Sequence, residues 1–163
     1  MNSSKTLFDS AMGGDRRALA KLLTIAEEGG STGSYDKKPS WVLGITGPPG
    51  AGKSTLIDRL ASNWSEKGES IAILAVDPSS PVSGGALLGD RARMVFSDPS
   101  KIYFRSVSSR GSSGGISNGV RRMVEVLQSL GWDRILIETV GAGQGEFANA
   151  SVADRVMLVE GPD

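Results

Sequence analysis

The sequence of 163 residues contains no cysteine and no histidine. Disulfides, thiol nucleophiles and imidazole bases are therefore excluded, together with the ligands on which most zinc, copper and nickel sites depend. Lysine plus arginine and aspartate plus glutamate number 18 each, which gives a formal net charge of zero. A neutral chain exerts no broad attraction on nucleic acid or on an anionic membrane, so we expect neither as a partner. What remains is oxygen chemistry from carboxylates, hydroxyls and the backbone.

Long apolar runs are also missing, because the longest extend over about seven residues and a membrane helix requires roughly 20. The first ten residues lack the basic-then-apolar order of a signal peptide. We therefore expect a cytoplasmic protein with no membrane partner. Glycine is abundant, with 22 residues where average usage is roughly 7%, and this surplus indicates loops built from backbone.

Short apolar runs alternate with amphipathic segments from Trp41 onward. The runs that predict strands are 41–46, 71–76, 102–105, 134–139 and 155–160. They lack strict alternation, which is typical of buried parallel strands. Helical spacing of apolar residues predicts helices over 54–66 and 117–130. Strand–helix–strand units of this kind predict an α/β fold with a mainly parallel sheet and helices on both of its faces.

A further amphipathic segment precedes this alternation. Residues 15–28 carry apolar side chains at helical spacing, with Asp15 as the N-cap and Gly29 and Gly30 as the stop. Residues 29–40 are polar and rich in glycine and serine, as linkers are. We therefore expect an N-terminal helix and linker over 1–40 and a nucleotide-binding domain over 41–163, for the reasons that follow.

A glycine-rich loop follows the first predicted strand, with the sequence GPPGAGKST over 47–55. It fits the pattern G-x-x-x-x-G-K-[ST], and it lies between a strand and a helix, as that phosphate-binding pattern requires. Its three glycines can adopt left-handed backbone angles and bring N–H groups close to phosphate oxygens. We expect Lys53 to reach the β and γ phosphates and the Ser54 hydroxyl to bind Mg²⁺. The predicted phosphate-binding residues are Gly47, Pro48, Pro49, Gly50, Ala51, Gly52, Lys53, Ser54 and Thr55.

Acidic residues follow later predicted strands, at the ends where parallel sheets collect their ligands. Glu138 stands near the carboxyl end of the run RILIET, and Asp77 directly follows the run IAILAV. Asp90 closes the Gly/Ser/Pro-rich loop that comes next, where it also suits a helix N-cap. Because Mg²⁺ takes oxygen ligands and usually only one or two carboxylates, the candidate metal ligands are Ser54, Asp77, Asp90 and Glu138.

Glu138 begins the sequence ETVG, which has the shape of the D-x-x-G switch of GTPases with glutamate in place of aspartate. In such a switch the N–H of Gly141 would meet the γ phosphate, and Gln144 could orient the attacking water. We therefore predict Lys53, Glu138 and Gln144 as catalytic residues and Gly141 as a further nucleotide contact.

With these motifs placed, the chain resembles the methylmalonyl-CoA mutase-associated GTPases of the MeaB/ArgK type. The stretches that carry the resemblance are GDRRALAKLLTIAEEG at 14–29, GITGPPGAGKSTLID at 44–58, AVDPSSPVSGGALLGDRARM at 75–94 and ILIETVGAGQGE at 135–146. The resemblance implies a three-layer phosphate-loop fold with an N-terminal helical appendage, and slow, Mg²⁺-dependent hydrolysis of GTP to GDP. It further implies a G-protein chaperone for a cobalamin-dependent acyl-CoA mutase such as methylmalonyl-CoA mutase, with homodimerisation in full-length relatives.

The carboxyl-terminal end departs from that family's pattern. Family members continue past the fifth strand into a further switch, a guanine-reading N-K-x-D segment and helical arms, whereas this chain ends in MLVEGPD at 157–163. The resemblance therefore predicts a C-terminally shortened chain whose last strand forms an exposed sheet edge. Guanine specificity rests on the resemblance alone.

Other activities fit the same phosphate site. An ATP-dependent kinase or ATPase would need a lid and a substrate region that we do not find in the sequence. A shortened chain could also bind nucleotide without hydrolysing it. A GTPase that delivers nickel or cobalt is disfavoured, because such proteins capture their metal with cysteine and histidine.

Overall fold

The computed structural model describes residues 2–33, 35–77, 98, 100–108, 113–139 and 150–161. The helices are α1 (Asn2–Met12), α2 (Arg16–Glu27), α3 (Lys53–Glu66) and α5 (Ser113–Ser129); the strands are β1 (Trp41–Thr46), β2 (Ile71–Asp77), β3 (Ile102–Ser108), β4 (Arg134–Thr139) and β5 (Arg155–Leu158). The strands form one sheet in the order β3–β2–β4–β1–β5, and each recorded pairing is parallel. The predicted strands and the predicted parallel sheet are therefore confirmed.

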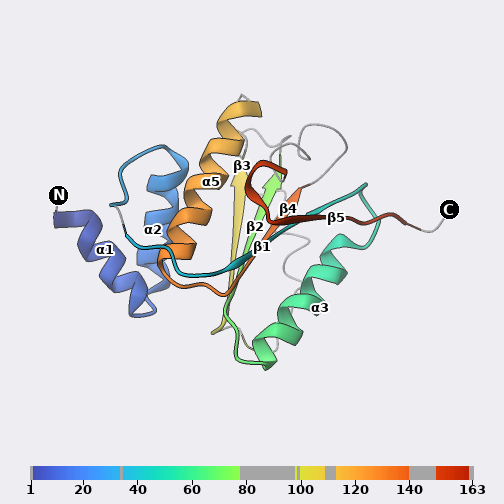
Figure 1. The fold of residues 1–163 in the computed structure, drawn as a ribbon, viewed down its shortest axis with the longest axis horizontal. Coiled ribbons are helices and arrows are strands. Elements are labelled where there is room, and N and C mark those ends of the chain that lie inside the picture. Colours follow the sequence, from blue (N-terminus) through green and yellow to red (C-terminus); the bar gives the residue numbers. More distant parts are fainter. Residues whose placement is uncertain are drawn as a thin grey trace.

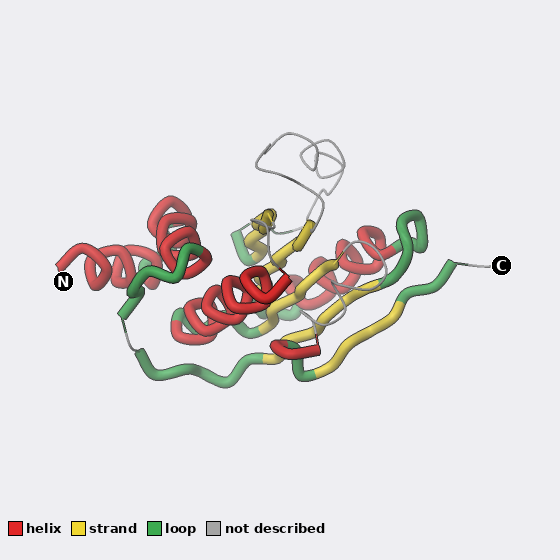
Figure 2. The backbone as a smooth tube through the Cα atoms, turned by 90° about the horizontal axis from the view of Figure 1, so that it is seen from above, coloured by secondary structure: helices red, strands yellow, loops and turns green. Residues whose placement is uncertain are grey.

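Helices cover both faces of the sheet (Figure 1). On one face Ile57 and Ala61 of α3 share a buried cluster with sheet residues that include Leu43 and Ile45 of β1. On the other face lie α2 and α5, and Figure 2 shows the same layering from above. The larger core on that side is formed by buried residues that include Leu19, Leu22, Leu23, Ala26, Val42, Leu74, Met123, Leu127, Ile135 and Ile137. The three-layer arrangement agrees with the predicted fold class.

Helix α2 begins where the sequence predicts, because the Asp15 side chain accepts hydrogen bonds from the backbone N–H groups of Arg17 and Ala18 at 2.8 and 3.2 Å. Helix α1, in contrast, was not predicted from the sequence. Its residues are mostly polar, but Phe8 is buried and its ring stacks on that of Tyr35 with 3.5 Å between ring centroids. Tertiary packing therefore accompanies this helix, which the spacing of apolar residues does not predict.

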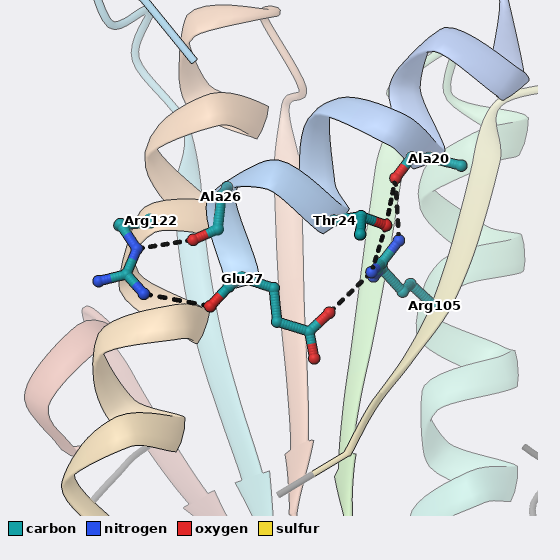
Figure 3. A network of polar contacts seen from close by, with 6 residues as sticks. All are labelled: Ala20, Thr24, Ala26, Glu27, Arg105 and Arg122. Atoms are coloured by element: carbon teal, nitrogen blue, oxygen red, sulfur yellow. Dashed lines mark hydrogen bonds and ion pairs between the residues drawn. The ribbon is translucent and has the colours of Figure 1, made fainter. Parts of the chain in front are cut away.

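Arg105 of β3 binds α2 at positions from Ala20 to its last residue, Glu27 (Figure 3). The guanidinium of Arg105 donates to the Ala20 carbonyl at 3.1 Å, to the Thr24 hydroxyl at 3.0 Å and to Glu27 Oε2 at 2.7 Å. The Arg105 and Glu27 side chains are only 16% and 19% exposed. This ion pair is therefore largely shielded from water, and its Coulomb attraction is correspondingly less screened.

The same end of α2 is fastened to α5 by Arg122. Its Nε donates to the carbonyl of Ala26 at 2.6 Å, and its Nη2 donates to the carbonyl of Glu27 at 3.1 Å (Figure 3). A cation at this position satisfies carbonyls that a helix end leaves without intrahelical partners and complements the negative end of the helix dipole. Gly119 of α5 permits the approach, because a Cβ there would lie 3.2 Å from the Glu27 carbonyl oxygen.

Strand β5 lies at one edge of the sheet, beside β1. Its side chains Val156, Met157 and Leu158 are 44%, 38% and 56% exposed, which confirms the predicted exposed edge strand. Asp154 precedes the strand and pairs with β1 through its backbone N–H and through its side chain. Within the described ranges, no helix is long and apolar enough to span a membrane.

Candidate nucleotide-binding site

The glycine-rich loop occupies the position that the motif requires, between the carboxyl end of β1 and the start of α3. The N–H of Ala51 donates to the Pro48 carbonyl at 3.3 Å and closes a tight turn. Gly50 and Gly52 have φ angles of +82° and +95°, which side-chain-bearing residues rarely adopt. These angles turn the chain sharply and form a backbone concavity of the kind that binds anions.

Lys53 is the first residue of α3 and is only 6% exposed. Its ammonium group donates to the carbonyls of Gly47 at 2.8 Å and Pro48 at 2.9 Å. A buried ammonium requires such partners, since burial without them is costly. The contacts place the positive charge beside the start of the loop. An ammonium has three N–H donors, so it can also contact a phosphate oxygen bound in the loop.

The N-terminus of α3 faces the same concavity. Its N-cap is Gly52, which makes no side-chain cap hydrogen bond, and its first turn contains no acidic residue. The N–H groups of the first turn have no intrahelical partners, and the helix dipole adds positive potential there. Ser54 and Thr55 are exposed in this first turn. This helix end is therefore suited to bind a phosphate group.

Glu138 lies at the same edge of the sheet as the loop. It is the penultimate residue of β4, and it pairs in register with Ile45, two residues before Gly47. The residue is 8% exposed. Asp77 ends β2, one position beyond the pair formed by Val76 and Thr139. The structure thus brings the backbones of Glu138 and Asp77 to the carboxyl edge where the phosphate loop begins.

Three further predicted site residues, Asp90, Gly141 and Gln144, lie outside the described residues. Among the predicted metal ligands that the structure describes, Ser54 and Glu138 carry side-chain oxygen atoms, which suit Mg²⁺ better than a softer metal. The described residues hold no cluster of three acidic, histidine or cysteine side chains that would bind a metal alone.

One contact at the loop was not foreseen from the sequence. A Cβ added to Gly47, whose φ is +144°, would lie 2.0 Å from the carbonyl oxygen of Val159, just past β5. The loop motif alone explains a glycine here by the close approach of phosphate, whereas the structure shows that the passage of another backbone also requires it. No local pattern signals such a contact, because the two residues are more than a hundred positions apart.

Comparison with known proteins places the chain in a family. A family model described as "Methylmalonyl Co-A mutase-associated GTPase MeaB" matches residues 12–163. The chain belongs to this family. Over 181 residues it is 44% identical to the Mus musculus MeaB relative named "Methylmalonic aciduria type A homolog, mitochondrial", covering 96% of this chain and 43% of that protein. Over 168 residues it is 39% identical to a Mycobacterium tuberculosis protein named "Probable GTPase", covering 94% of this chain and 49% of that protein.

Solved structures support the fold of this MeaB family member. The crystal structure titled "LAO/AO transport system kinase" matches with a TM-score of 0.70 and 25% sequence identity, covering 97% of this chain and 50% of the other. The signal recognition particle receptor FtsY from Elizabethkingia anophelis, in complex with GDP, matches in fold alone, with a TM-score of 0.50 and 19% identity over 84% of this chain and 42% of that chain. The chain spans about half the length of the curated relatives it matches.

Proposed function

We propose that this chain binds GTP and GDP together with Mg²⁺ through the loop at 47–55, hydrolyses GTP, and acts as a G-protein chaperone for a cobalamin-dependent acyl-CoA mutase. The observation that carries nucleotide binding is the buried Lys53 ammonium, held beside a left-handed glycine loop at the N-terminus of a helix. The guanine base and the mutase partner rest on the family and on the names of its members.

Different groups of the described residues would contact the phosphates and the metal. The backbone N–H groups of the loop and of the first turn of α3 would cradle the phosphates, and Lys53 would balance charge on the β and γ groups. Ser54, with Glu138 and Asp77 at neighbouring strand ends, would hold Mg²⁺ and its water ligands. When bound, Mg²⁺ neutralises negative charge on the phosphate oxygens.

Hydrolysis additionally requires a group that orients water. We propose that Gln144 has this role and that the N–H of Gly141 contacts the γ phosphate. Asp90 would be a further ligand of the metal. Glu138, near the carboxyl end of β4, would orient a water molecule in the site. Helix α2 would form part of the same folded unit as the domain at 41–163, because its buried residues share one core with those of α5 and the sheet.

The proposal is tested by calorimetric titration with GDP and with ADP, each with and without Mg²⁺. We expect Lys53→Ala to weaken GDP binding by about 10- to 150-fold, the range of a hydrogen bond to a charged group. Lys67→Ala is the matched control, because Lys67 is exposed at the other end of the same helix. Equal GDP affinity in both variants would refute the phosphate-loop assignment.

The same titration separates the alternatives for base and for catalysis. A preference for GDP over ADP would locate guanine recognition within these 163 residues, whereas equal affinities would assign it to parts of the longer relatives that this chain lacks. Release of inorganic phosphate from GTP is then measured with the unaltered chain. Nucleotide binding with no release would favour the alternative in which this chain binds without hydrolysing.

A further inference from the structure

Strand β5 pairs with β1 along its length, and further hydrogen bonds extend this pairing past both of its ends. At its start, the N–H of Val42 donates to Asp154 Oδ2 and the N–H of Asp154 donates to the Val42 carbonyl, both at 2.8 Å. At its end, the N–H of Val159 donates to the Thr46 carbonyl at 2.8 Å, and the Val159 side chain packs against the core beneath α3. The side chains between these two points are exposed.

The end of β5 also touches the phosphate loop directly. The Val159 carbonyl oxygen occupies the space where a Cβ on Gly47 would lie, at 2.0 Å. Two residues later, a Cβ on Gly161 would be 3.9 Å from the Cα of Ala51. The stretch 159–161 therefore lies beside the loop at Gly47 and at Ala51. The path of the loop and the position of this stretch each depend on the other.

We propose that Val159 is a positioning residue for the phosphate loop, and that nucleotide binding and docking of β5 are thermodynamically linked. The inference rests on the proposed function. The Val159 side chain anchors the stretch in the core, and its backbone then fixes where the loop leaves β1 at Gly47. The N–H groups that cradle phosphate follow from that starting point. A chain with β5 displaced would bind nucleotide less tightly, because only the docked fraction is competent.

The first test compares Val159→Ala with Val156→Ala by calorimetric titration with GDP and Mg²⁺. Both variants remove the same side-chain atoms, and the two valines are three positions apart. Val156 is 44% exposed, whereas Val159 packs against the core. We expect Val159→Ala to weaken GDP binding by about fivefold and Val156→Ala to change it by less than about twofold. Val159→Ile, which retains the core contact, is expected to restore affinity. Equal affinities for the two alanine variants would overturn the inference.

A second test needs no substitution and therefore does not depend on folding of a variant. Hydrogen exchange of backbone amides is measured in the unaltered chain with and without GDP and Mg²⁺. We expect slower exchange at Val159 and along β5, besides slower exchange in the loop. Protection of the loop without protection of β5 would overturn the linkage and leave the proposed function intact. No GDP binding at all would overturn the proposed function and the linkage with it.

Discussion

Removing the carboxylate of Glu27 is expected to destabilise the fold by much more than removing a comparable carboxylate at the surface. Glu27 ends α2 and pairs with Arg105 of β3, with 2.7 Å between Oε2 and Nη2. Glu27→Ala would leave the Arg105 guanidinium with its bonds to Ala20 and Thr24, while its buried Nε has no partner in the described structure. The arginine would then hold an uncompensated charge in a largely buried position.

The magnitude follows from the exposure of the pair. Breaking a fully buried ion pair costs about 3–5 kcal/mol, and an exposed pair contributes about 0–1 kcal/mol. At 16% and 19% exposure, we place the loss at about 2–3 kcal/mol. Removing an acid from the negative end of a helix returns about 0.5 kcal/mol. The net loss of about 2 kcal/mol corresponds to a lowering of Tm by about 6 °C for a domain of this size.

The assay is thermal unfolding followed by circular dichroism, with Glu125→Ala as the control. Glu125 pairs with Lys37 at 3.1 Å, but these side chains are 45% and 52% exposed. We expect the control to lower Tm by less than about 2 °C. Equal shifts for the two variants would refute the reasoning from burial. A double-mutant cycle with Arg105→Leu then measures the coupling, which we expect at about 1–3 kcal/mol.

Two further predictions concern other parts of the structure. Gly33→Ala is expected to lower the free energy of unfolding in urea by about 2 kcal/mol, and Gly14→Ala by about 1 kcal/mol. Both glycines have φ near +90°, but only a Cβ at Gly33 would collide with Tyr35, at 2.7 Å. Equal losses would contradict a role for that contact. Glu138→Gln is expected to change GDP affinity by less than about threefold and to lower the rate of phosphate release from GTP at least about tenfold. The reason is that Glu138 acts in turnover under the proposed function. A parallel loss of affinity and rate would argue for a role in binding alone.

The central strands could be predicted because burial on both faces leaves a strong local signature. The runs at 41–46 and 134–139 match β1 and β4 residue for residue. Their positions also predict that Glu138 lies at the edge of the sheet where the phosphate loop begins, because the carboxyl ends of parallel strands share one edge. The loop itself could be read from glycine and lysine spacing, since those residue types are dictated by backbone geometry and phosphate charge.

What could not be predicted depends on contacts between distant segments. Helix α1 carries few apolar residues, and its burial of Phe8 depends on the ring of Tyr35 from the segment that the sequence analysis assigned as a linker. The contact of Gly47 with Val159 is likewise non-local, and so is the capping of β1 by Asp154. The spacing of apolar residues predicts which residues are buried, but it does not predict which distant residues they contact.

The strand order has a consequence for how the chain reaches its fold during synthesis. Strand β1 pairs with β4 and β5, so Trp41 finds its partner Arg134 about 90 residues further along the chain. At a ribosomal rate of about 5–20 residues per second, that partner emerges roughly 5–20 s later. Until then an apolar strand and the start of the phosphate loop have no parallel neighbour in the sheet. Strand β1 and the start of the phosphate loop are therefore synthesised well before the strands that flank β1 in the sheet, which makes the nascent β1 a natural client for chaperones during translation.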